Sequence, residues 1–507
     1  MGEAVPGGVQ CDEPLYGFAK FREWGADATS VAAGVLMLLR MQRYVRQKVW
    51  LGSAMTALAV VASTAASGET LETALAAAYA NNPQLNAQRA NVRSIDEGVP
   101  QALAGYRPRI TASGSIGEQF TNTTSKASTA SNQYLLQSGT MTPSSVGITA
   151  TQTLYNGFQT ANRTRQAESS VFAARETLRS TEQAVLLNAA TAYMNLLRDR
   201  AILDLQRRNV EVLTEQLRQT RDRFNVGEVT RTDVAQSESR LASGRSQVLT
   251  AESNFKTSAA VYRQVIGNDP GGLTAASPVD RFSPHNLADV VNVATARHPN
   301  VVSAQHGVDV AELQVRVAEG ALSPTVTLQG NAQQALESSP TQLKTFSASI
   351  IGQVSVPIYQ GGSEYSTIRQ AKETLGQRRL DLDTARDSVR QVAVQSWGQL
   401  EAAKANIEAT QSQVQAAEIA LNGVREEARV GQRTTLDVLN AQQELVNARV
   451  ALVTAQRDRV VASYGLLSSV GRLAPQVIGL RVPTYDARVH YHQVRDSWFG
   501  MRTPDGR

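Results

Sequence analysis

The same series of segments occurs twice along the sequence, in the same order. This internal repeat constrains the fold more than any other feature. Pro299 follows Pro83 by 216 residues (299 minus 83), and Tyr359 follows Tyr155 by 204 residues (359 minus 155). The spacing shrinks by 12 residues because the first copy has a longer insert, residues 121–140, which is rich in Ser and Thr and is predicted to be an exposed loop. We therefore expect two similar structural units that differ mainly in this loop.

Each copy is predicted to supply two β-strands of about ten residues. Residues 346–358 alternate apolar and polar side chains, which is the period-two pattern of a strand with one apolar face. Residues 146–154 alternate less regularly, and residues 109–117 and 325–332 are the expected hairpin partners. The chain should therefore contain four strands, and about ten residues is the length that a tilted strand needs to cross a bilayer.

Long proline-free segments follow the strands, and their apolar residues recur every seven positions. This heptad pattern produces the narrow apolar seam of a coiled coil. The seam residues are Ala189, Leu196, Leu203, Val210, Leu217 and Phe224 in the first copy and Ala393, Leu400, Ile407, Val414, Leu421 and Ala428 in the second. The expected helices are residues 70–104, 157–226 and 231–266, then 286–320, 361–430 and 434–472. At 1.5 Å per residue, each of the two longest helices would span about 105 Å.

The strands and helices together indicate a fold class. Four strands are too few to close a barrel, and an open sheet leaves unpaired backbone groups at both edges. Aromatic residues make up only 5% of the chain, which is typical of long alanine-rich helices and not of several globular cores. We expect a mainly α protein with a membrane β-barrel, in which several copies of the chain share one barrel that continues into a tube of antiparallel helices.

The N-terminal region has the order of charged and apolar residues found in a secretory signal peptide. Residues 43–48 are basic, and residues 49–66 are apolar and end in small side chains. A transmembrane anchor is the alternative, because the apolar run approaches the roughly 20 residues that span a bilayer, but the small-residue end favours cleavage. Met37 and Met41 lie just before the signal, which raises the hypothesis that residues 1–40 are not translated.

Five regions are therefore expected along the chain. They are an N-terminal extension with the signal peptide (1–67), the first repeat (68–268), a linker (269–285), the second repeat (286–472) and a C-terminal tail (473–507). The tail is charged, contains scattered aromatic residues and is expected either to pack on the helices or to remain mobile.

The composition argues against several classes of protein. Cys11 is the single cysteine, so a disulfide framework is excluded. The net charge is +5 and the basic residues are interspersed with acidic ones, so nucleic acid is not an expected partner. His490 and His492 are two residues apart and make a weak metal candidate. The repeats contain no spacing typical of a catalytic or metal site, so neither an enzyme nor a cofactor is expected.

A V-G-x5-D-V element joins the long helix to the third helix in each copy. The first element contains Gly227 and Asp233, and the second contains Gly431 and Asp437, in both cases 204 residues later. The glycines are expected at turns that need a positive φ. An aspartate near a helix start can cap backbone N–H groups and interact favourably with the helix dipole. A local capping role is therefore one explanation for both aspartates.

The ordered set of features resembles the TolC-like outer-membrane efflux proteins, the exit ducts of type I secretion and drug efflux. The resemblance covers roughly residues 68–472. It rests on the twofold repeat, the Asn82-Pro83 and His298-Pro299 elements, the LYNG and IYQGG sequences after the strands, and the paired V-G-x5-D-V turns. It implies a homotrimer that forms a twelve-stranded barrel in outer-membrane lipid and a helical tunnel through the periplasm, with no catalysis and no cofactor.

The resemblance also implies partners and site residues. The partners are an inner-membrane transporter, of the ABC or RND type, and a periplasmic adaptor protein. Asp437 falls on an acidic position that constricts the pore, and Arg433 falls on the arginine of a network between chains. Thr232 and Asp233 fall on the partners of that arginine in the first copy.

Two positions depart from the pattern of well-studied members. Asn440 stands where a second acidic residue of the pore ring is expected, and Ala428 stands where an aromatic residue of the network is expected. The aperture of this protein should therefore be less acidic and differently latched.

The sequence leaves alternatives open. Type I protein secretion and multidrug efflux are not separated, because the inner-membrane partners largely choose the cargo. A periplasmic coiled-coil spacer without a pore is a structural alternative, but it would need neither the alternating strands nor the Tyr and Gly landmarks beside them.

Overall fold

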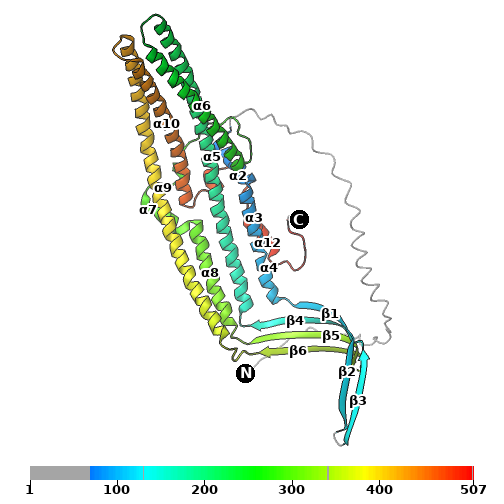
Figure 1. Ribbon diagram of the computed structural model, residues 1–507. Coiled ribbons are helices and arrows are strands. Elements are labelled where there is room, and N and C mark those ends of the chain that lie inside the picture. The colour runs from blue at the N-terminus through cyan, green and yellow to red at the C-terminus, as the bar shows by residue number, and fades with distance from the viewer. Residues whose placement is uncertain (1–68, 129–130, 340–341, 505, 507) are drawn as a thin grey trace, which may run out of the picture. The chain divides into compact units, whose positions relative to one another are not determined.

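The computed structural model describes residues 69–128, 131–339, 342–504 and 506. In both repeat copies, opening helices are followed by strands, a 67-residue helix and a last helix, and the first copy contains additional elements (Figure 1). The expected signal peptide, Met37, Met41 and Cys11 lie outside the described residues. The first copy contains α2 (Leu71–Asn81), α3 (Pro83–Asp96), α4 (Gly98–Leu103), η2 (Ala104–Tyr106), α5 (Gln159–Asn225) and α6 (Arg231–Ile266). The second contains α7 (Leu287–Arg297), α8 (Pro299–Gly320), α9 (Ser363–Arg429) and α10 (Thr435–Ser469).

The two longest helices have the predicted length and seam. α5 and α9 each contain 67 residues and pack along α6 and α10, respectively, while α8 lies between α5 and α9 (Figure 1). Ala189, Leu196, Ala393 and Leu400 of the heptad seam are fully or almost fully buried. Phe224, in the last turn of α5, is instead exposed. The coiled-coil prediction is thus confirmed along most of the seam.

The predicted opening helix of each copy is not continuous, which corrects the expectation of single helices over 70–104 and 286–320. Each is interrupted before a proline, because proline has no N–H and disfavours helical backbone in the residue before it. The Asn82 side chain accepts hydrogen bonds from the N–H groups of Gln84 and Leu85 and so begins α3. His298 Nδ1 accepts from the Asn300 N–H at 3.1 Å and begins α8 in the same way.

The four predicted strands form one antiparallel sheet in the order β1-β4-β5-β6. The strands are β1 (Arg109–Ile116), β4 (Ser144–Asn156), β5 (Thr325–Ser339) and β6 (Gln342–Ser355). Directly opposite residues share a face of the sheet. The mainly apolar face carries Ile110, Ile116, Val146, Ile148, Leu328, Phe346, Ile350 and Val354, and the mainly polar face carries Thr111, Ser113, Thr149, Thr151, Gln329, Asn331, Ser349 and Gln353. The large residues of the apolar face are exposed to solvent in the single chain.

The insert of the first copy is a β-hairpin, so its prediction as an exposed loop was wrong. β2 (Gln119–Ser128) and β3 (Ser131–Met141) pair with each other and form a separate two-stranded sheet. A structureless connection of 20 residues is uncommon in a compact domain, and the β-branched threonines of this segment favour extended backbone.

The largest core lies where the linker meets both repeats. Tyr193, Tyr262 and Tyr464 are almost fully buried there, beside Leu75 and Leu467. The Tyr193 hydroxyl lies 2.8 Å from the carbonyl oxygen of Glu69 and 2.7 Å from that of Thr274. These contacts join the start of the first repeat to the linker.

The C-terminal tail packs on the helices of the first repeat, as one of the two expectations stated. It contains α11 (Pro475–Ile478) and α12 (Ala487–Val494). His490 Nδ1 of α12 lies 3.0 Å from Asp96 Oδ2 at the end of α3, and Arg175 lies 4.0 Å from the other Asp96 oxygen. Burial raises the pKa of Asp96, although the His490 hydrogen bond and the Arg175 charge act in the opposite direction. Asp96 is fully buried, so its partners hold the tail in place.

Two glycines let α8 and the start of α5 approach backbone to backbone. A Cβ on Gly320 would lie 2.5 Å from the carbonyl oxygen of Gly157, and a Cβ on Gly157 would lie 2.3 Å from that of Gly320. Gly157 also has a φ of +63°, which disfavours other residues. This contact joins the two repeat copies beside the sheet.

We predict that Gly320→Ala lowers the free energy of unfolding by about 1–3 kcal/mol, because its methyl group forces the two backbones apart. Gly307→Ala is the matched control in the same helix, since a Cβ there would meet no atom within 4 Å. It should leave stability unchanged or raise it by up to about 1 kcal/mol. Thermal or denaturant unfolding of the purified variants measures both, and equal effects would contradict the close approach.

We also predict that His490→Ala frees the tail, because it leaves the buried Asp96 carboxylate without this hydrogen bond at a cost of about 1–3 kcal/mol. Proteolytic cleavage within residues 473–504 should become faster, while the helices of the repeats keep their resistance. His492→Ala, which changes an exposed residue of the same helix, should leave cleavage unchanged. Equal cleavage rates for both variants would show that the His490 contact does not hold the tail.

Candidate functional site

The candidate site consists of the two helix-hairpin turns at the ends of α5 and α9 that lie farthest from the sheet. Each turn joins a 67-residue helix to a helix of the same repeat copy, and Figure 1 shows the two turns next to each other. We call them the first tip (residues 223–238) and the second tip (residues 427–442). All the residues that the sequence predicted for the site belong to these tips.

Each tip begins with a glycine that ends the long helix. Gly227 and Gly431 both have a φ of +80°, as predicted, and a Cβ on either would meet no atom within 4 Å. In the first tip the Gly227 N–H donates to the Phe224 carbonyl and the Glu228 N–H to the Arg223 carbonyl, both at 2.9 Å. This pair of bonds is a Schellman motif, which needs left-handed backbone at the glycine. The second tip has the equivalent pair of bonds.

Each tip continues into the next helix through a capping box, which confirms the local role of both aspartates. Asp437 Oδ2 accepts from the Thr434 N–H at 3.0 Å and from the Thr434 hydroxyl at 2.9 Å, and the Asp437 N–H donates back to that hydroxyl at 3.2 Å. Asp233 forms the same three bonds with Thr230. These bonds fix both carboxylates at the start of α10 and α6.

The capping hydrogen bonds also set the charge of Asp437. The Thr434 N–H and hydroxyl, and then the Arg433 charge, hold the pKa of Asp437 below its ordinary value. The carboxylate is therefore charged at neutral pH. Its stabilising effect on the cap is present above the ordinary pKa and is lost as the pH falls through the lowered one.

The two tips carry ion pairs of opposite arrangement. In the first tip, Arg223 of the long helix lies 3.0 Å from Glu228 of the turn. In the second tip, Glu427 of the long helix lies 2.8 Å from Arg433 of the turn. Glu427 is the repeat counterpart of Arg223, so the long helix presents a positive charge in one copy and a negative charge in the other. The family resemblance had indicated Arg433 but not the exchange of charge between Arg223 and Glu427. The 204-residue offset between the copies aligns these two positions and could have indicated it.

In the ranges that the structure describes, no hydrogen bond or ion pair joins the remaining predicted site residues to one another. Asn440 Oδ1 accepts from Arg240 of α6 at 2.7 Å, so Asn440 joins the second tip to the first-copy helix within one chain. Thr232 is exposed, and in the described part of the chain its hydroxyl has no hydrogen-bond partner. Arg433 and Thr232 are not brought together within the single chain. Ala428 is half-buried and contributes no ring contact.

A polar cleft of about 900 Å³ lies between the two tips. Its charged lining residues are Glu211, Glu215, Glu228, Asp233, Glu426, Arg223, Arg425, Arg429 and Arg433. The Arg218 hydrogen bond lowers the pKa of Glu215 to about 2, so this acid remains charged. Side chains of both signs of charge line the cleft, which is suited to a polar protein surface and not to an apolar ligand.

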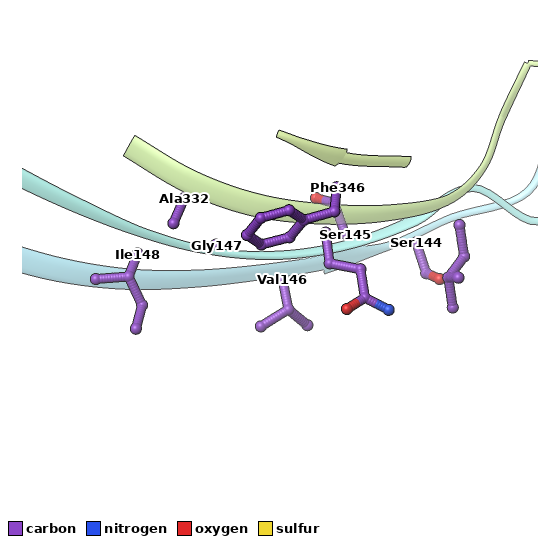
Figure 2. A pocket seen from close by; sticks show the side chains of 9 residues that line it. Ser144, Ser145, Val146, Gly147, Ile148, Ala332 and Phe346 are labelled. Carbon is purple, nitrogen blue, oxygen red and sulfur yellow. The ribbon is translucent and has the colours of Figure 1, made fainter. Parts of the chain in front are cut away.

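A second hollow, of about 410 Å³, lies on the sheet (Figure 2). Figure 2 shows Val146, Ile148, Ala332 and Phe346 along neighbouring strands around it. These four residues share the apolar face of the sheet, because Ala332 is opposite Ile148 and Phe346 follows the same alternation. The hollow is therefore part of the exposed apolar face, and it brings no charged group into position for chemistry.

Within the described ranges, no three His, Cys, Asp or Glu side chains come together as a group that could hold a metal ion. His490 is buried against Asp96, whereas its neighbour His492 is exposed, so the two do not form a pair. None of the helices in the described part of the chain has the length and apolarity needed to cross a membrane.

Comparison with known proteins gives one family. The Outer membrane efflux protein family matches residues 74–268 and 290–472, which follow the two repeat copies. The outer membrane efflux protein BepC of Brucella suis is 43% identical over 449 residues, covering 88% of this chain and 95% of BepC. The outer membrane protein TolC of Escherichia coli K12 is 27% identical over 412 residues, covering 78% of this chain and 81% of TolC.

The solved structures agree with this at the level of the fold. The crystal structure of the Campylobacter jejuni CmeC outer membrane channel superposes with a TM-score of 0.70 at 16% identity, covering 88% of this chain and 94% of CmeC. The resemblance inferred from the repeat and its motifs is confirmed. The chain belongs to the Outer membrane efflux protein family.

Proposed function

We propose that this protein is a homotrimeric outer-membrane channel that serves as the exit duct of type I protein secretion or efflux. The observation that carries the proposal is the two-faced sheet. One face is apolar and exposed, the other is polar, and strands of this kind alternate between lipid and a water-filled lumen in transmembrane barrels. Three copies would supply twelve strands, which is enough for an open pore.

The long helices give the channel its second part. α5 begins three residues after β4 ends and continues for 67 residues, which corresponds to about 100 Å of helix. α9, which also has 67 residues, begins eight residues after β6 ends. A tube of such helices from three copies would carry the pore through the periplasm, with the tips at its inner end.

The tips are suited to form the aperture and to meet partner proteins. Asp437 of three chains would form an acidic ring near the pore axis, and Arg433 would face Thr232 and Asp233 of a neighbouring chain. Within one chain the Arg433 guanidinium pairs with Glu427, and among the described residues the Thr232 hydroxyl has no hydrogen-bond partner. The charged cleft would receive a periplasmic adaptor, through which an inner-membrane transporter of the ABC or RND type supplies the energy.

The cargo class has two candidates. The name of BepC describes an efflux protein, which supports a role for this chain as the outer-membrane component of a multidrug efflux pump. The name of TolC does not state a cargo. A coiled-coil spacer without a pore remains the alternative from a different class, and the exposed apolar face argues against it because a spacer gains nothing from such a surface.

The direct test is conductance of the purified protein in planar lipid bilayers. A channel is expected to give discrete single-channel currents, since its polar faces would enclose water. Protein that is inserted in the bilayer and gives no current under any voltage or cation condition would favour the spacer.

We predict that Asp437→Ala reduces block of this current by divalent cations, because the variant removes the acidic ring. Thr434→Ala is the matched control, since it removes the hydroxyl of the same cap and leaves the Asp437 carboxylate in place. Block that falls in both variants equally, or in neither, would indicate that Asp437 acts as a cap alone.

A second prediction separates the cap from the contacts between chains. Thr230→Ala removes the capping hydroxyl of α6 and should destabilise the start of that helix by about 1 kcal/mol. Hydrogen exchange at residues 231–236 would measure this as faster exchange. Thr232→Ala should leave this exchange unchanged in the separated chain but should increase spontaneous opening of the channel. If Thr232→Ala leaves channel opening unchanged, Thr232 is no part of the latch.

A further inference from the structure

The C-terminal tail ends in a short segment of large apolar side chains that are exposed. Trp498 is 60% exposed, Phe499 is 91% exposed and Met501 is fully exposed. We call residues 498–501 the tail end. Exposed apolar side chains that are grouped in this way mark surfaces that meet another protein or a membrane.

Contacts just before the tail end fix its position. Arg495 of the tail lies 3.5 Å from Glu168 of α5. Arg107 Nη1 donates to the Ser497 carbonyl at 2.6 Å, and the guanidinium carbon of Arg107 lies 4.6 Å from the centre of the Trp498 ring. The tail end is therefore held beside Arg107 and presents its apolar side chains from a defined place.

Arg107 places the tail end at one particular level of the molecule. It stands two residues before Arg109, the first residue of β1, so the tail end lies at the end of the sheet that joins the helices (Figure 1). Further exposed aromatic residues occur at this same end of the strands, namely Tyr106, Tyr155, Phe158 and Tyr359. Transmembrane barrels carry such aromatic residues in a girdle at each bilayer surface. In the proposed channel, this level would therefore be the bilayer surface on the side of the helices.

The two faces of α5 indicate on which side of the helical wall the tail lies. Glu168 and Arg175 are on the face that contacts the tail. Thr177, Ala184 and Asn188 are exposed and lie on the opposite face, since they are about half a helical turn away. Two of these three small side chains can hydrogen-bond to water, so this face suits the water-filled tunnel. The tail then belongs on the outer surface, where a bilayer would surround the base of the sheet.

We propose that the tail end inserts into the headgroup region of the phospholipid leaflet nearest the helices. The inference rests on the proposed membrane channel and adds a lipid contact outside the barrel. Trp498 suits this level because its ring is apolar while its N–H remains able to hydrogen-bond. Phe499 and Met501 would remove further apolar surface from water.

The charges around the tail end are complementary to a phospholipid surface. Arg109 and Arg502 are both exposed, and Arg107 lies against Trp498. These three arginines outnumber Asp496, the acidic residue next to the tail end in the sequence. Guanidinium groups bind phosphate oxygens through paired hydrogen bonds, so lipid phosphates are suitable partners for the exposed arginines.

Fluorescence quenching by brominated lipid tests this contact. The full-length protein is reconstituted into vesicles of phosphatidylethanolamine and phosphatidylglycerol, and three of its four tryptophans are changed by Trp24→Phe, Trp50→Phe and Trp397→Phe. Trp498 is then the single reporter. We expect lipids brominated near the headgroup to quench Trp498 strongly, and lipids brominated near the end of the acyl chain to quench it less, because the ring would lie at the bilayer surface.

Two matched reporters, each combined with Trp498→Phe, give the reference values. Phe346→Trp lies on the exposed apolar face of the sheet and should be quenched by the proposed lipid contact of that face. Leu249→Trp is an exposed position of α6, far from the sheet along the helices, and should not be quenched.

The reporters separate failure of the tail contact from failure of the proposed function. Quenching of Phe346→Trp without quenching of Trp498 would overturn the tail contact and leave the channel standing. No quenching at either position, in protein that floats with the vesicles, would contradict the membrane sheet and with it the tail contact. Equal quenching of Trp498 and Leu249→Trp would show unspecific adsorption and would also overturn the proposal.

Arg107→Ala tests how the tail end is positioned. This variant removes the hydrogen bond to Ser497 and the guanidinium beside Trp498. Quenching of Trp498 should fall, while that of Phe346→Trp should stay the same. Unchanged quenching of Trp498 would contradict the placement of the tail end by Arg107, from which its level at the bilayer surface is derived.

Discussion

The constraint on which the structure depends is that the backbone N–H and C=O groups of every strand must be hydrogen-bonded. The sheet is four strands wide, its apolar face is bare, and β1 and β6 each leave one row of N–H and C=O groups unpaired. In lipid, each unpaired group costs several kcal/mol, so open edges do not occur there. In the proposed trimer, this sheet would therefore be one part of a larger closed barrel.

The same repeat explains why the two tips differ. Both tips use one local design, in which a glycine ends the long helix and a Thr–Asp capping box begins the next. On this common backbone the ion pairs are exchanged, with Arg223 and Glu427 at equivalent positions. The cap role of Asp437 and its proposed place in an acidic ring are compatible, because the cap fixes the carboxylate and keeps it charged. The exchanged charges affect contacts between chains only where the first tip of one chain meets the second tip of another.

Much of the fold could be predicted because it depends on local periodicity. The seven-residue spacing predicted α5 and α9 to within a few residues, and alternation predicted all four strands of the main sheet. The breaks at Asn82 and His298 were missed because helix propensity was given more weight than the proline that follows each. The β2–β3 hairpin was missed because its threonines were interpreted as loop residues, although they favour extended backbone.

The candidate site was predictable in position but not in its contacts. The repeated Gly and Asp located both tips, yet the Arg240–Asn440 bond joins residues 200 positions apart, and no pattern in the sequence indicates it. The His490–Asp96 contact that fastens the tail is equally distant in sequence. Such contacts depend on how packed helices meet in space, and a single sequence does not encode them in any periodic signal.

The claim that copies of the chain complete the sheet is tested most directly by hydrogen–deuterium exchange of the assembled protein in detergent or lipid. We expect the amides of β1 and β6 to be protected as strongly as those of β4 and β5, because all four strands would then have partners on both sides. Fast exchange along β1 and β6, with protection confined to β4 and β5, would show that the edges remain open and would contradict the account.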